Sequence, residues 1–139
     1  MEKKELFKKN KVSLIITIVL VVAIAALLIF SKVNVITDGQ TITIKSALER
    51  VVIDYDNVMS VEKADSINVG SRVMGADLIK IYSGTFKNDE YGRYKLYIYK
   101  DIKDYIVIQY ENGFVVINQK TEELTDQLYK TILDEFANR

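Results

Sequence analysis

The chain has 139 residues, 49% of them apolar, and its 19 lysines and arginines balance 19 aspartates and glutamates. It contains no His, Cys, Pro or Trp, which excludes a disulfide framework, thiolate chemistry, zinc-finger sites and histidine-dependent catalysis. The length suits one domain with an appendage, and the apolar fraction is large enough for a packed core.

Residues 12–30 form an apolar run of nineteen residues without a charge, VSLIITIVLVVAIAALLIF. As an α-helix this run is roughly 28 Å long, close to the hydrocarbon thickness of a bilayer. A core helix of a soluble protein is rarely apolar on every face. We therefore predict a transmembrane helix whose ends are Val12 and Phe30.

A cleaved signal peptide is the rival interpretation of this segment, because Ala23 and Ala25 have the small-x-small spacing of a cleavage site. Cleavage there would leave the apolar residues 27–30 at the new terminus. We therefore expect an uncleaved anchor. Ser13 and Thr17 lie four residues apart within it, a small-residue spacing that permits helix self-association.

Lysines are concentrated before the apolar run. Residues 1–11 carry five lysines and two glutamates, whereas the fifteen residues after the run carry only Lys32 and Lys45. This asymmetry predicts a single-pass protein of the cell membrane, with a basic cytoplasmic tail (residues 1–11) and an extracytoplasmic domain (residues 31–139). The lysines would also draw the tail toward anionic lipid. An exported domain without Cys suits a bacterium that does not rely on disulfides.

Alternating apolar and polar residues predict strands from Val33 onward. Asp38 and Gly39 form a tight-turn pair between residues 33–37 and 40–45, which predicts a first hairpin. Short β-rich runs follow at residues 51–53 and 58–61, and turn residues separate them.

Further strands are predicted at residues 78–82, ended by Ser83-Gly84, and at residues 94–99, where apolar side chains cover both faces. Asn112-Gly113, between the apolar runs 105–111 and 114–118, is a strong signal for another hairpin. The last segment changes period, because apolar residues recur at helical spacing from residue 124 to 136, and Thr121 is a suitable N-cap.

These elements predict an α+β, mainly β domain: about seven short antiparallel strands in a barrel or sandwich, closed by one amphipathic C-terminal helix. Short motifs in the same order resemble the bacterial PH-domain (pleckstrin-homology-like) family, whose members are often small membrane-anchored proteins. The motifs are Arg72-Val73-Met74-Gly75, Ser83-Gly84-Thr85-Phe86, the strand 94–99, residues 114–118 and the helix after Thr121. The resemblance covers roughly residues 33–137 and implies a scaffold, which does not by itself fix a function.

Catalysis without His and Cys would have to rest on carboxylates, hydroxyls, Lys or Arg. Asp54 and Asp56, two apart in an extended segment, could bind a hard cation or act as the acid–base pair of a hydrolase. The other ligands of a calcium loop are missing, because Met59 and Asp65 stand where Gly and Glu would be needed. We predict two solvated turn aspartates, with no metal site, no cofactor and no enzyme activity.

Four side chains are candidates for binding a ligand: Arg72, Tyr91, Arg93 and Tyr97. Arg72 stands among glycines, where a guanidinium beside flexible backbone can hold a carboxylate or phosphate. The tyrosine-rich stretch with Arg93 could contact a carbohydrate or a peptide. Surface exposure of Arg72 and packing of the tyrosine rings in the sheet are the simpler alternatives.

The domain is slightly acidic. Residues 31–139 carry fourteen Lys and Arg against seventeen Asp and Glu, without a basic run, which disfavours nucleic acid and anionic lipid as its ligands. We predict a membrane-anchored PH-like interaction module or accessory subunit at the outer face of a bacterial cytoplasmic membrane. It would contact lipid through the helix and an unidentified protein through the domain, and a homo-oligomer is conceivable. A carbohydrate- or peptide-sensing domain that uses the tyrosine-rich strand is the alternative, and a carboxylate-dependent hydrolase is a weaker one.

Overall fold

The computed structural model describes residues 2–139 and divides into two compact units, of which the second is Ser31–Arg139. The first unit is a single helix, α1 (Glu2–Phe30), long and apolar enough to cross a membrane and with no buried residue in its most apolar window. The helix begins at Glu2, so the residues expected to form a separate basic tail belong to the same helix from that point on.

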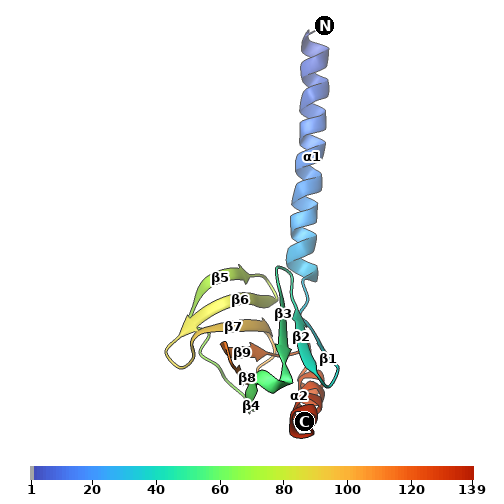
Figure 1. The fold of residues 1–139 in the computed structure, drawn as a ribbon. Coiled ribbons are helices and arrows are strands. Elements are labelled where there is room, and N and C mark those ends of the chain that lie inside the picture. Colours follow the sequence, from blue (N-terminus) through green and yellow to red (C-terminus); the bar gives the residue numbers. More distant parts are fainter. Residues whose placement is uncertain (1) are drawn as a thin grey trace. The chain divides into compact units, whose positions relative to one another are not determined.

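The second unit begins with a small antiparallel sheet of three strands, β1 (Asn34–Thr37), β2 (Thr41–Lys45) and β3 (Arg50–Asp54), shown in Figure 1. The hairpin predicted around Asp38-Gly39 is confirmed. The Asp38 carboxylate accepts the backbone N–H groups of Thr41 and Gln40 at 2.8 and 2.9 Å, and these hydrogen bonds lower the pKa of Asp38.

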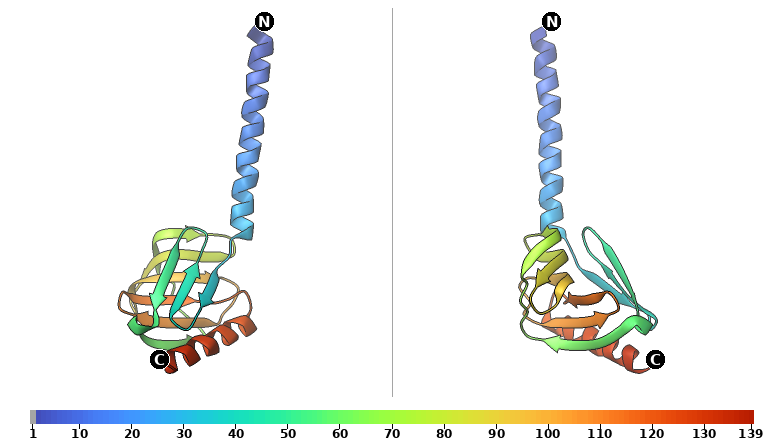
Figure 2. Two further views of the ribbon diagram at one scale, coloured as in Figure 1. Left: turned by 45° about the vertical axis from the view of Figure 1, so that its right-hand side comes forward. Right: turned by 60° about the vertical axis from the view of Figure 1, so that its left-hand side comes forward.

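A larger sheet of six strands follows the short 3-10 helix η1 (Tyr55–Asn57). Its strands in chain order are β4 (Val58–Ala64), β5 (Ser71–Asp77), β6 (Ile81–Asn88), β7 (Gly92–Tyr99), β8 (Tyr105–Tyr110) and β9 (Gly113–Ile117). In space the order is β4-β8-β9-β7-β6-β5, and only the β7–β9 pair is parallel. The strands of the small sheet cross those of the larger sheet (Figure 2).

The mainly β sandwich with a C-terminal helix is confirmed, but the predicted number and pairing of its strands differ from those observed. Residues 2–139 contain nine strands rather than about seven. Of the two predicted forms, barrel or sandwich, the sandwich is present, because the larger sheet ends at β4 and β5 without closing. The sheet is also not wholly antiparallel, because β9 inserts between β8 and β7 and runs parallel to β7.

Two strand boundaries also differ from the predicted ones. Leu78 to Lys80 form a turn, and β6 begins at Ile81 and continues through Gly84 to Asn88. The predicted hairpin at residues 105–118 is present, but Tyr110 pairs with Gly113, so its loop is residues 111–112 rather than Asn112-Gly113.

The larger sheet is apolar on both faces. On one face, Tyr97, Ile108 and Ile117 pack in a core cluster with the small sheet and with the C-terminal helix α2 (Glu122–Ala137). On the other face, a second cluster built around Phe86, Leu96 and Val116 is covered by half-buried residues that include Ile67 and Val69, from the segment before β5.

Helix α2 begins where the sequence predicts. The Thr121 hydroxyl accepts the Leu124 N–H at 3.0 Å, and Ile132 is completely buried. Near the end of α2, Glu135 accepts hydrogen bonds from Thr37 of β1 and from the Tyr55 hydroxyl, the latter at 2.6 Å. Burial and the Glu135 carboxylate raise the pKa of Tyr55. This network fastens the helix to the small sheet.

Two glycines bring β5 and β6 together. Gly75 pairs with Gly84, and both have positive φ, +119° and +144°. A Cβ at Gly75 would lie 2.3 Å from the Ser83 carbonyl oxygen and 2.6 Å from the Gly84 Cα. Only glycine fits this contact, which explains why a glycine-rich segment is part of a strand.

We expect Gly75→Ala to lower the free energy of unfolding of the domain by about 2–4 kcal/mol, because steric overlap adds to backbone strain. Gly92→Ala is the matched control, since Gly92 also has positive φ (+67°) but none of the described atoms lies within 4 Å of its Cβ position. Its cost is the backbone term alone, about 1–2 kcal/mol. All nine tyrosines lie in residues 31–139, so tyrosine fluorescence during urea unfolding of the detergent-solubilised chain reports on the domain. Equal losses in the two variants would contradict the close contact.

Candidate functional site

A pocket of about 270 Å³ lies between the turn that joins β2 to β3 and strands β5 and β6 at one edge of the larger sheet. Six residues line it: Leu48, Glu49, Met74, Gly75, Ser83 and Thr85. Leu48 and Met74 expose 61% and 73% of their surface. Two large apolar side chains left in solvent at one hollow are typical of a surface that contacts another molecule.

Local backbone features of β5 and β6 create this pocket. The register shifts between Arg72 and Met74, which indicates a β-bulge at Val73. One step further along the strands, the Gly75–Gly84 pair removes two side chains from the sheet. The turn at residues 46–49 is held above this region, because the hydroxyls of Ser46 and Ser83 form a hydrogen bond.

Glu49 supplies the charged wall of the pocket. It accepts a hydrogen bond from the hydroxyl of Tyr97, and its other carboxylate oxygen lies 3.3 Å from the Lys95 Nζ. Tyr97 is completely buried, and its burial, followed by the Glu49 carboxylate, raises the pKa of its hydroxyl. The carboxylate is therefore held in place from both sides and does not swing freely in solvent.

The sequence does not single out Glu49 as a site residue. It stands in a short turn, four residues after β2 ends at Lys45, and its partners Lys95 and Tyr97 come from β7. No local pattern connects residues almost fifty positions apart. Only the packing of the small sheet across the larger one brings them together.

The tyrosines predicted as binding candidates lie on opposite faces of the larger sheet. Tyr97 belongs to the cluster that faces the small sheet, whereas Tyr91 packs against the other cluster. The Tyr91 ring is half-buried, with its centroid 4.6 Å from that of Phe114 and 5.4 Å from that of Tyr94. The structure therefore does not assemble Tyr91 and Tyr97 into one surface.

The two candidate arginines are also separate. Arg72 is exposed on the edge strand β5, next to the bulge. Arg93 is exposed near the start of β7, directly across from Lys87 of β6. Neither arginine lines the pocket beside Glu49.

The acidic pair Asp54 and Asp56 has a local structural role. The Asp54 carboxylate accepts the Asp56 N–H at 2.9 Å and caps η1, and Asp56 lies 3.3 Å from Arg139. Within residues 2–139 no group of three or more acidic side chains is placed to hold a metal ion. Helix capping accounts for the spacing of the two aspartates.

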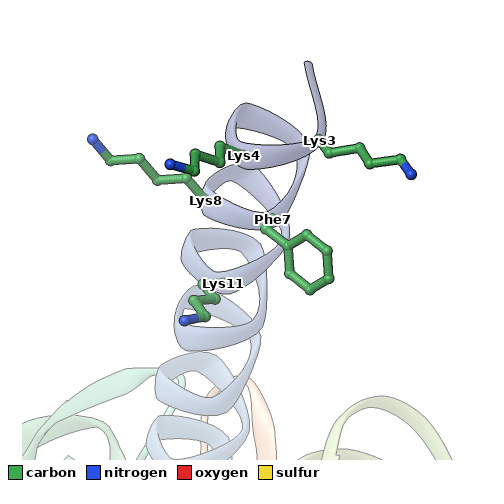
Figure 3. A pocket seen from close by; sticks show the side chains of 5 residues that line it. All are labelled: Lys3, Lys4, Phe7, Lys8 and Lys11. Carbon is green, nitrogen blue, oxygen red and sulfur yellow. The ribbon is translucent and has the colours of Figure 1, made fainter. Parts of the chain in front are cut away.

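The N-terminal end of α1 carries a basic face of its own. Figure 3 shows Lys4, Lys8 and Lys11 extending from one side of the helix and Lys3 from the other, next to the ring of Phe7, which is 69% exposed. At 3.6 residues per turn, the two glutamates in this segment lie away from that face. A single helix bounds the hollow between these side chains, so it is an open charged surface rather than an enclosed cavity.

A family model described as "Bacterial PH domain" matches residues 33–132. No curated protein and no solved structure matches the chain.

We expect Glu49→Ala to lower the free energy of unfolding by about 1–3 kcal/mol, because it leaves the buried Tyr97 hydroxyl without an acceptor. Glu49→Gln keeps an acceptor oxygen and loses only the half-exposed ion pair with Lys95, so it should cost less than about 1 kcal/mol. Urea unfolding of both variants measures the difference. In a Tyr97→Phe background Glu49→Ala should cost much less, and an unchanged cost would show that the two side chains are not coupled.

Proposed function

The chain belongs to the bacterial PH domain family, and from this premise we propose that it is a single-pass membrane protein that acts as a non-enzymatic interaction module or accessory subunit. In this proposal residues 1–11 are cytoplasmic, residues 12–30 span the membrane and residues 31–139 lie outside it. The domain displays the pocket beside Glu49 to a partner protein at the outer face of the cytoplasmic membrane.

The short connection between helix and domain is the observation that carries the proposal. Helix α1 ends at Phe30, and only three residues later Val33 is buried in the core of the domain, with 3% of its surface exposed. The Val33 N–H donates to the Tyr99 hydroxyl at 3.1 Å, and that hydroxyl lies 3.2 Å from the Val33 carbonyl oxygen. Three extended residues cover only about 10 Å. If α1 spans the bilayer, the domain can reach only partners close to the membrane.

The position of the lysines supports the proposed orientation. Five lysines precede the apolar run and none lies within it, and such an excess favours retention of that end in the cytoplasm. The basic face around Phe7 suits the anionic cytoplasmic leaflet, where each close lysine contributes about 1 kcal/mol.

The chemistry of the pocket favours binding over catalysis. Its one carboxylate, on Glu49, is engaged by Tyr97 and Lys95, and the sequence supplies no His or Cys as a base or nucleophile. A small pocket between two exposed apolar side chains suits one anchoring side chain of a partner protein.

Single-cysteine labelling tests the orientation, because the chain has no Cys of its own and an introduced Cys is therefore its one labelling site. In intact cells, a membrane-impermeant maleimide should label Asp89→Cys, in the exposed β6–β7 turn, and should leave Lys4→Cys unlabelled. Permeabilised cells should show both labelled. The reverse pattern in intact cells would overturn the proposed orientation.

Photo-crosslinking tests the interaction surface in the native membrane. A photoreactive amino acid at Met74, which lines the pocket, should yield a discrete crosslinked protein band. The same amino acid at Lys120, an exposed position outside the pocket, is the control and should not yield that band. Identical bands from both positions, or none from Met74, would remove the pocket as the partner-binding surface.

A further inference from the structure

One end of the domain is basic, although the domain as a whole is slightly acidic. The chain enters the small sheet at Asn34, which pairs with Lys45 of β2, and Lys45 pairs in turn with Arg50 of β3. Two cations thus stand directly opposite each other beside the point of chain entry. Like charges in this position destabilise a sheet, so their placement calls for an anionic neighbour.

The turn between β5 and β6 belongs to this same end. The backbone carbonyl oxygen of Lys80 in this turn accepts a hydrogen bond from the Lys100 N–H at 2.9 Å. The residue before Lys100 is Tyr99, whose hydroxyl accepts the Val33 N–H. The hydrogen bond between Ser46 and Ser83 fixes the tip of the β2–β3 hairpin beside β6. In Figures 1 and 2 the hairpin tip and the end of β5 lie at the same edge of the domain.

This turn presents both a cation and an apolar side chain. Lys80 is exposed, and Ile79 leaves 64% of its surface in solvent. An exposed isoleucine next to a lysine at a turn is the combination that enters the boundary between headgroups and acyl chains.

The cations at this end are available to an outside partner. Within residues 2–139, Lys45, Arg50 and Lys80 form no ion pair, nor does Lys32 on the connection from α1. The acids nearby are already engaged: Glu49 by Tyr97 and Lys95, and Asp77 by Lys100. The next loop adds one negative charge, on Asp101, and one positive charge, on Lys103, which cancel in the sum.

The opposite end of the domain is acidic. The β1–β2 turn lies there, and Thr41 of β2 pairs with Asp54 at the end of β3. The backbone N–H of Glu111 donates to Asn57, which places the β8–β9 turn beside η1. The acidic side chains of this region are Asp38, Asp54, Asp56, Glu111 and Glu135, of which Glu135 accepts hydrogen bonds from Thr37 and Tyr55 and Asp56 forms an ion pair with Arg139.

We propose that the entry end of the domain rests on an anionic lipid surface, with Lys45, Arg50 and Lys80 at the headgroups and Ile79 at the apolar boundary. The proposal rests on the proposed function in one respect, that α1 spans the bilayer. A connection of only two residues, Ser31 and Lys32, keeps the entry end close to the bilayer. The turn at residues 46–49 belongs to this end, so a partner protein in the pocket beside Glu49 would itself lie at the membrane surface. The acidic end is repelled by the same surface, so the charge distribution fixes which way the domain stands.

Fluorescence in nanodiscs tests this contact with the full-length chain. A fluorophore whose emission depends on polarity, attached at Ile79→Cys, should shift to shorter wavelength and be quenched by lipid-bound nitroxide. Both effects should be strong in discs of phosphatidylcholine with phosphatidylglycerol and weak in discs of phosphatidylcholine alone. The same fluorophore at Asn112→Cys, in the turn at the acidic end, should respond to neither lipid. Added salt should reduce the effect at position 79.

Neutralising variants separate these three cations from overall charge. Each cation close to an anionic surface contributes about fivefold to binding, so Lys45→Gln, Arg50→Gln and Lys80→Gln together should lower the ratio of docked to free domain on the order of 100-fold. Lys87→Gln, Lys120→Gln and Lys130→Gln together change the net charge equally at exposed positions elsewhere and should leave the quenching intact.

The outcomes distinguish this proposal from the proposed function. Failure of the chain to co-elute with discs in high salt would refute the span, and the lipid contact with it. Co-elution with equal quenching in neutral and anionic discs would refute the lipid contact alone. Loss of quenching in both triple variants would likewise refute the role of this particular end.

Discussion

A sheet that is apolar on both faces has to be covered twice, and this requirement shapes the whole domain. Strand β7 makes it explicit, because Leu96 and Ile98 face one core cluster while Tyr97 faces the other. The small sheet and α2 cover one face, and the segment before β5 covers much of the other. Parallel pairing with β9 keeps β7 inside the sheet. The pocket beside Glu49 lies where the small sheet stops covering the larger one.

Much of the architecture could be predicted from local patterns, since hairpins and a capped amphipathic helix are encoded over a few residues. The turn at Asp38 and the N-cap at Thr121 are of this kind. Strand β5 could not be recognised, because its bulge breaks the alternation of side chains and Gly75 resembles a turn residue. The insertion of β9 beside β7 is a long-range choice that no local signal records.

The candidate site was less accessible to sequence reasoning than the fold. A buried hydroxyl and its acceptor, such as Tyr97 and Glu49, become partners only after two sheets pack. Charge behaves in the same way. The sum over residues 31–139 is slightly negative, yet the register of β1, β2 and β3 collects Lys45 and Arg50 at one end and leaves Asp54 at the other. A net charge measures the monopole of a domain, whereas its orientation at a surface depends on the dipole.

The bulge in β5 has a consequence for crowding. Membrane anchoring confines proteins to two dimensions and raises their local concentration, so a flat, open strand edge would invite sheet-to-sheet polymerisation. The irregular register after Arg72 and the charge of its guanidinium make β5 a poor template for another strand. At the other edge, α2 packs against β4, and Lys63 of β4 binds Asp126 of α2. The irregular, charged strand at one edge and the helix at the other therefore make edge-to-edge pairing between the sheets of neighbouring copies unfavourable.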